Sequence, residues 1–171
     1  AWRHGAEKVV AAGAGASYPG SALPPLREDA LWDGFPQQDN APYALAKRMM
    51  HIQALAYWRQ HHFPIVLALL GSVYGPRDNF DPATAPVVSA QIRRIVDAVE
   101  SDAPSIAPWG TGAATRDLIY AADLATGLIL AAERCAESDV LNLSSGTETS
   151  IRELVETLCD IAGYRGAINW D

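Results

Sequence analysis

Strand-type and helix-type segments alternate along the chain, and this alternation restricts the fold more than any other feature. A short apolar run at Val9–Gly13 and a continuous one at Ile65–Leu70 are typical of strands buried in a parallel sheet. Between them, apolar residues recur at helical spacing from Tyr43 to His62, after Pro42, which suits a first helical turn. This order predicts an α/β fold in which helices return the chain to a parallel sheet.

The second half of the chain continues the alternation. Apolar periodicity predicts a helix over about 87–101, and a third helix is expected over about 123–134. Residues 140–143 and 168–170 are further strand candidates. Ser150 and Glu153 have the spacing of a capping box, which predicts one more helix, ending near Gly163. Asn40 is the expected cap of the helix that begins near Pro42.

Length and charge limit the classes of function. The 171 residues suit one domain with a sizeable core, and a net charge of -7 argues against a nucleic-acid partner. No apolar run approaches the roughly 20 residues that span a bilayer, so we expect no membrane contact and a cytoplasmic location. Cys135 and Cys159 are too few for a disulfide framework. His61 and His62 have no cysteine or carboxylate cluster beside them in the sequence, so we expect no metal.

A glycine-containing turn follows the first predicted strand but lacks the dinucleotide-binding fingerprint. That fingerprint needs a third glycine three residues after Gly15, where this chain has Tyr18. Residues 17–40 are rich in proline and glycine, which predicts a long surface loop in place of the required helix. The phosphate cradle of a dinucleotide site is therefore missing from this sequence.

Tyr43 and Lys47 lie four residues apart on a predicted helix, so their side chains share one face. A nearby ammonium stabilises a phenolate, which lets a tyrosine donate or accept a proton. Many helices carry such a pair with no chemical role, so a purely structural interpretation stays open at this point.

Three further segments carry distinctive residues. Gly71–Pro82 reads GSVYGPRDNFDP, Trp109–Gly112 reads WGTG, and Arg116–Ala125 reads RDLIYAADLA. The first follows a buried strand, at the end where open α/β sheets bind ligands. Together with Tyr43 and Lys47, these segments resemble the extended short-chain dehydrogenase/reductase family, the NAD(P)-dependent epimerases and dehydratases of nucleotide sugars. The resemblance extends over nearly the whole chain, is most specific at Tyr74–Pro82, and is strongest with the 3,5-epimerase/4-reductase branch.

The resemblance implies the later part of a Rossmann-type parallel sheet with flanking helices and a small substrate-side lobe. Residues of about 1–82 and 87–101 would supply Rossmann-side elements, and about 102–171 mixed substrate-side and sheet elements. The family's glycine fingerprint and its C-terminal substrate segment have no counterpart in these residues, so we expect a partial domain. NAD or NADP is the implied cofactor.

The resemblance also implies roles for single residues. Tyr43 would be the catalytic acid/base, and Lys47 would favour its phenolate form and hydrogen-bond the nicotinamide ribose. Ser72 would join Tyr43 and Lys47 in binding the cofactor, at a position where the family commonly has asparagine.

A nucleotide-sugar substrate would contact three other residues. The Trp109 indole would pack against the ligand, and the Arg116 guanidinium would bind phosphate or ribose oxygens. Arg94 is a further candidate for the diphosphate. Without the resemblance, Trp109 fits equally well as a partly buried anchor and Arg94 as a solvated helix residue.

Several positions depart from the family pattern. Ala14 replaces the serine or threonine whose hydroxyl binds the reacting oxygen, and Leu70 replaces a common proline. Ala16 and Pro86 replace the cysteine and histidine that the 3,5-epimerase branch uses to move protons. Ser17 is the nearest remaining hydroxyl, and we expect it to point away from the site.

Three classes of function remain open. The chain is part of a nucleotide-sugar epimerase, dehydratase or reductase, a catalytically degenerate nucleotide-sugar-binding module, or a protein-interaction domain. A sheet without its first strands leaves an unpaired edge, so we also expect a homodimer or a partner that completes the sheet.

Overall fold

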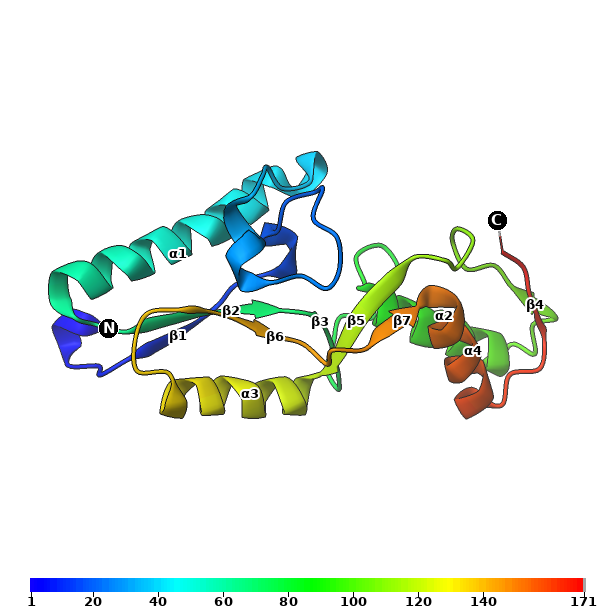
Figure 1. Ribbon diagram of the computed structural model, residues 1–171. Coiled ribbons are helices and arrows are strands. Elements are labelled where there is room, and N and C mark those ends of the chain that lie inside the picture. Colours follow the sequence, from blue (N-terminus) through cyan, green and yellow to red (C-terminus); the bar gives the residue numbers. More distant parts are fainter. Residues whose placement is uncertain (171) are drawn as a thin grey trace. The chain divides into compact units, whose positions relative to one another are not determined.

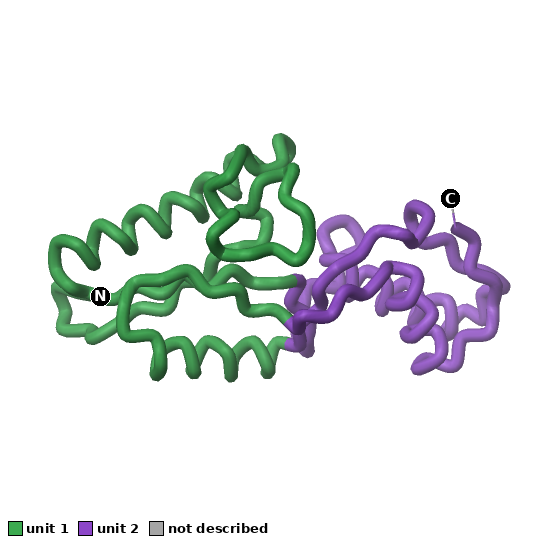
Figure 2. Tube along the Cα trace, in the orientation of Figure 1, with its two compact units in different colours: residues 1–71, 121–144 green, residues 72–120, 145–171 purple. Residues whose placement is uncertain are grey.

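Residues 1–170 are described by a computed structural model in which strands and helices alternate, as the sequence predicts (Figure 1). Contacts divide the chain into two compact units, shown in different colours in Figure 2. Unit 1 holds Ala1–Gly71 and Ala121–Ser144, and unit 2 holds the described residues of Ser72–Tyr120 and Ser145–Asp171. Asp171, the last residue of the predicted partial domain, lies outside the described residues. The division into Rossmann-side elements over about 1–82 and 87–101 and mixed substrate-side and sheet elements over about 102–171 stays a prediction.

A three-stranded parallel sheet forms the centre of unit 1. Its strands are β1 (Val9–Ala12), β2 (Ile65–Leu70) and β6 (Val140–Leu143), in the order β1-β2-β6. The middle strand is buried from Val66 to Leu69, which explains its unbroken apolar run. All three predicted strands of this sheet are confirmed.

Two helices cover this sheet, α1 (Ala41–His61) on one face and α3 (Ala121–Arg134) on the other (Figure 1). The buried positions of α1 are Ala41, Ala44, Arg48 and Ala54. The three alanines let the helix backbone lie close to its neighbours, while larger apolar residues of α1 stay on its exposed side. The burial of Arg48 is the exception in this pattern.

The segment between β1 and α1 contains three short 3-10 helices, η2 (Gly15–Ser17), η3 (Glu28–Trp32) and η4 (Gln38–Asn40). Proline and glycine exclude a long element here but still allow single 3-10 turns. Pro42 lies in the first turn of α1, as predicted. Asn40 is the N-cap residue of α1, as predicted, but its side chain makes no capping hydrogen bond.

Unit 2 contains a small sheet of β3 (Ser72–Tyr74), β5 (Thr115–Tyr120) and β7 (Glu148–Ser150). Strands β3 and β5 run parallel, whereas β7 runs antiparallel to β5. A short parallel pair joins β4 (Ser105–Ile106) to β8 (Ala167–Ile168). The sequence did not predict β5, because its first three residues are polar and interrupt any apolar run.

The helices of unit 2, α2 (Val87–Glu100) and α4 (Ile151–Ala162), share a buried core. Its largest fully buried side chains are Ile95 and Val155. The predicted capping box is present, since the Ser150 hydroxyl accepts from the Glu153 backbone N–H while the Glu153 carboxylate accepts from the Ser150 N–H. The bonds that the Glu153 carboxylate accepts from the Ser150 N–H and from the Ser150 hydroxyl hold the pKa of Glu153 below its usual value. Within residues 1–170, no helix has both the length and the apolarity to cross a membrane.

Candidate functional site

Tyr43 and Lys47 meet near the carboxyl end of β1. The Lys47 Nζ atom lies 5.6 Å from the centroid of the Tyr43 ring, and it donates a hydrogen bond of 2.8 Å to the Ala12 carbonyl oxygen. Tyr43 is 52% exposed, so a ligand can reach its hydroxyl. The structure therefore brings a tyrosine and an ammonium together at the edge of the sheet where parallel folds bind ligands.

The backbone that follows β1 is held tightly against β2. The Gly13 N–H donates to the Ala68 carbonyl oxygen at 2.7 Å. A Cβ atom at Gly13 would lie 2.9 Å from the Ala68 carbonyl oxygen, a backbone atom, and 2.8 Å from Leu69 Cδ2, so only glycine fits this close approach. Ala14 is extended, and the 3-10 helix η2 starts at the next residue. A pyrophosphate cradle requires a glycine-rich loop that leads directly into an α-helix. The backbone after β1 does not have this form, because it leads into the 3-10 helix η2.

Ser17 does not replace the hydroxyl that Ala14 lacks. Its side chain is fully buried, and its Oγ has no hydrogen-bond partner in the part of the chain that the structure describes. A buried hydroxyl cannot contact a ligand at the surface beside Tyr43. The expectation that Ser17 points elsewhere is consistent with this burial.

A polar network that the sequence analysis missed ties the long segment before α1 to β6. The Tyr18 hydroxyl donates to Asn142 Oδ1 at 2.7 Å, and Asn142 Nδ2 donates to the Leu26 carbonyl oxygen at 3.0 Å. The Asn142 backbone N–H donates to the Glu28 carboxylate at 2.8 Å. Burial raises the pKa of Tyr18, the bond to Asn142 opposes this, and the charges of Glu28 and Asp29 add to it. The available signal was an asparagine inside an apolar strand.

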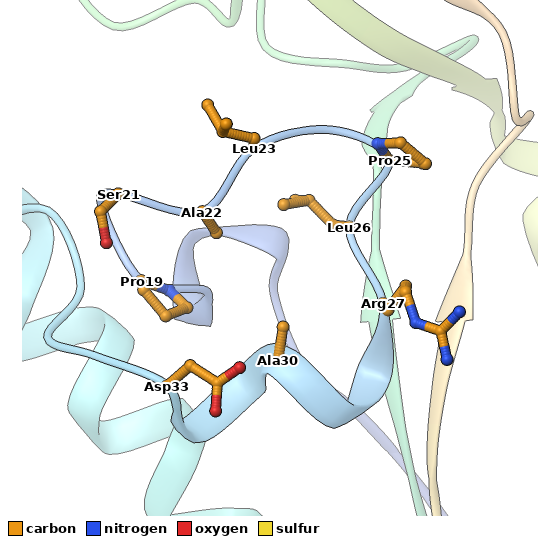
Figure 3. Close-up of a pocket in the computed structure, with 9 residues that line it drawn as sticks. All are labelled: Pro19, Ser21, Ala22, Leu23, Pro25, Leu26, Arg27, Ala30 and Asp33. Atoms are coloured by element: carbon orange, nitrogen blue, oxygen red, sulfur yellow. The ribbon is translucent and has the colours of Figure 1, made fainter.

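The same segment lines a cavity of about 280 Å³ that is open to solvent, drawn in Figure 3. Its lining residues are Pro19, Ser21, Ala22, Leu23, Pro25, Leu26, Arg27, Ala30 and Asp33. Arg27 already pairs with Asp29 at 3.1 Å. None of the residues predicted for catalysis, cofactor or substrate lines this cavity, so it is separate from the candidate site.

Unit 2 holds the remaining predicted residues. The Arg94 guanidinium lies 5.4 Å from the centroid of the Trp109 ring, and Arg94 Nη1 donates to Gln91 Oε1 at 2.9 Å. The Trp109 side chain is 75% exposed, which does not fit the alternative of a partly buried anchor. Arg94 and Trp109 therefore form one surface with a cation and an aromatic face.

Arg116 and Ser72 lie on paired strands of the small sheet in unit 2. Ser72 is the first residue of β3 and lies opposite Leu118 of β5. Arg116 lies near the start of β5, where it is exposed and its Nη1 donates to the Thr115 carbonyl oxygen at 2.7 Å. The guanidinium has further N–H groups besides the one in this bond, and these can bind an anion.

Comparison with known proteins identifies the family. Residues 1–144 match the model of the NAD dependent epimerase/dehydratase family. The chain belongs to this family. Family membership confirms the resemblance inferred from the sequence, the Rossmann-type α/β fold and NAD or NADP as the family's cofactor class.

Relatives of this epimerase/dehydratase chain include GDP-L-fucose synthases. That of Sinorhizobium fredii is 35% identical over 99% of this chain and 54% of its own length, and GDP-L-fucose synthase 1 of Arabidopsis thaliana is 33% identical over 100% and 53%. A solved GDP-L-fucose synthetase from Naegleria fowleri, bound to NADP, superposes with a TM-score of 0.90 at 22% identity, covering 99% of this chain and 55% of that one. The chain thus spans about half the length of the curated relatives it matches.

Proposed function

We propose that the protein containing this chain is an NAD(P)-dependent reductase of the nucleotide-sugar epimerase/dehydratase family, acting on a 4-keto nucleotide sugar in the cytoplasm. The observation that carries the proposal is the position of Lys47 Nζ, 5.6 Å from the centroid of the half-exposed Tyr43 ring and hydrogen-bonded to Ala12 at the end of β1. Family membership and the GDP-L-fucose synthase relatives support the substrate class.

The residues present fit one end of the cofactor. The hydroxyl of the half-exposed Tyr43 and the Lys47 ammonium suit the nicotinamide ribose, since an ammonium retains two N–H donors after bonding Ala12. The backbone from Gly13 to Ser17 does not form a pyrophosphate cradle, so the phosphates must be held by other parts of the protein. We also propose that Ser72 contacts the cofactor.

Proton transfer is the task of Tyr43 in this proposal. When bound, the reduced cofactor supplies the hydride that adds to the ketone carbon. The Tyr43 hydroxyl donates its proton to the carbonyl oxygen, which becomes the alcohol, and the Lys47 ammonium stabilises the phenolate that remains. Because Tyr43 is half exposed, water can return the proton.

Unit 2 supplies the proposed nucleotide-sugar contacts. The exposed Trp109 ring offers an apolar face to a base or sugar, and the Arg94 and Arg116 guanidinium groups offer N–H donors to diphosphate or ribose oxygens. Trp109, Arg94 and Arg116 all belong to unit 2.

The departures from the family pattern decide between reduction and epimerisation. Neither the Ala16 methyl group nor the Pro86 ring can carry a proton. The test is to run the full-length protein with a 4-keto nucleotide sugar and reduced cofactor in deuterated water. We expect reduction with no deuterium at the carbons beside the ketone. Deuterium at those carbons would contradict the loss of epimerisation. A protein that consumes no cofactor would support the second candidate, a degenerate binding module. Ala14 favours this second candidate, because it lacks the hydroxyl that would bind the reacting oxygen.

Assembly is a further part of the proposal. Among residues 1–170, strand β1 pairs with β2 alone, and α1 exposes Leu45, Met49 and Ile52. Exposed strand edges and apolar patches are usually covered in soluble proteins. We therefore expect sedimentation of the 171-residue chain to show a homodimer or a complex with a partner. A stable monomer at high concentration would contradict this.

A further inference from the structure

Arg48 is a buried arginine whose role the proposed chemistry leaves unexplained. It lies on the inner face of α1 and is 5% exposed. Its Nε atom donates to the Ser17 carbonyl oxygen at 2.6 Å, and its Nη1 atom donates to the Gly34 carbonyl oxygen at 2.7 Å. One guanidinium thus connects the two ends of the 17–34 segment, and its carbon atom lies 5.4 Å from the centroid of the Trp32 ring.

Burying this charge is costly. None of the ion pairs among residues 1–170 includes Arg48, and burial lowers its pKa. Its Nη2 atom is enclosed without a hydrogen-bond partner in the described chain, as is the neighbouring Ser17 Oγ. An apolar side chain of similar volume would avoid this cost, so packing alone does not account for an arginine. The arginine guanidinium, by contrast, carries several N–H donors in one plane, and this arrangement suits the binding of two carbonyl groups.

The position of Arg48 beside Lys47 suggests what this binding achieves. Lys47 binds the carbonyl oxygen of Ala12, and Arg48 binds that of Ser17. Consecutive residues of α1 therefore fix both ends of the 13–16 backbone. The same helix carries Tyr43 one turn earlier, so these two bonds set where the backbone at Ala14 lies relative to the Tyr43 hydroxyl.

We propose that Arg48 is a positioning residue, which holds the 13–17 segment against α1 at the place that the proposed proton transfer requires. This inference rests on the proposed function. Arg48 and Tyr43 both belong to α1, so the bonds of Arg48 also fix how the Tyr43 hydroxyl lies relative to this segment. A reacting group displaced by about 1 Å can lose about a hundredfold in rate, so Arg48 affects turnover without touching substrate.

The first measurement does not depend on activity. Hydrogen exchange followed by mass spectrometry compares Arg48→Met with Arg59→Met, the same substitution at an exposed position of the same helix. We expect Arg48→Met to speed exchange in peptides covering 13–34 at least tenfold, with exchange in β2 unchanged and with Arg59→Met resembling the original protein. Unchanged exchange over 13–34 would overturn the inference.

The second measurement uses turnover by the full-length protein. We expect Arg48→Met to lower kcat about 10- to 100-fold with little change in KM for the nucleotide sugar, and Arg48→Lys to recover part of kcat because an ammonium can still bind one carbonyl. If Arg48→Met leaves kcat unchanged while Tyr43→Phe loses turnover, the positioning role of Arg48 is overturned and the proposed function stands. No turnover with any nucleotide sugar would overturn both.

Discussion

Replacing Tyr43 with phenylalanine in the full-length protein should lower the reduction of a 4-keto nucleotide sugar by about 10²- to 10⁴-fold, the usual contribution of a positioned acid/base. Phenylalanine keeps the ring beside the Lys47 ammonium and removes only the hydroxyl, so the loss reports proton transfer. The measurement is the rate at which reduced cofactor is consumed at saturating substrate.

Tyr57 offers a matched control for this substitution. It lies on the same helix and is 41% exposed, but it packs with Trp2, His61 and Phe63 at the far end of α1. Tyr57→Phe should leave the rate within about twofold of the original, as surface substitutions usually do. Equal rates for Tyr43→Phe and Tyr57→Phe would exclude Tyr43 as the proton donor.

Introducing a hydroxyl at Ala14 should raise the rate of reduction. One oriented donor to a developing oxyanion typically contributes about 10²- to 10³-fold in rate. Hydrogen bonds already fix the backbone on both sides of Ala14: Lys47 binds the Ala12 carbonyl, the Gly13 N–H binds β2, and Arg48 binds the Ser17 carbonyl. We therefore expect Ala14→Ser to increase kcat by up to this factor, measured by cofactor consumption.

Serine at Ala6, an exposed position before the amino end of β1, is the control. Ala6→Ser adds the same hydroxyl at the opposite end of this strand from the candidate site, and it should leave kcat unchanged. If Ala14→Ser and Ala6→Ser give the same rate as the original protein, then the missing hydroxyl does not limit turnover.

The sequence predicts the elements that follow from local patterns. A continuous apolar run specifies β2, and a run that is apolar except for Asn142 specifies β6. Helical periodicity specifies α2, and the spacing of Ser150 and Glu153 specifies the start of α4. Strand β5 could not be predicted in this way, since Arg116 and Asp117 give its first half a polar surface. Its pairing with β3 and β7 depends on contacts distant in sequence.

The candidate site shows the same limit. Helical geometry alone places Lys47 one turn after Tyr43, so their proximity could be predicted. The bond from Lys47 to Ala12 depends on how α1 lies against the sheet, which the spacing does not determine. Arg48 escaped prediction because a charged residue on a helix is expected at the surface, and only tertiary packing encloses it.

Both units are discontinuous in the sequence, because the chain changes unit after Gly71, Tyr120 and Ser144. A single crossover between this gene and a relative would therefore produce a mosaic of parental residues within at least one unit. Exchange of unit 2 as a whole requires two replaced stretches, 72–120 and 145 onward, with the parental 121–144 retained between them. Recombination libraries with breakpoints at these three junctions should yield folded chimeras more often than libraries with random breakpoints.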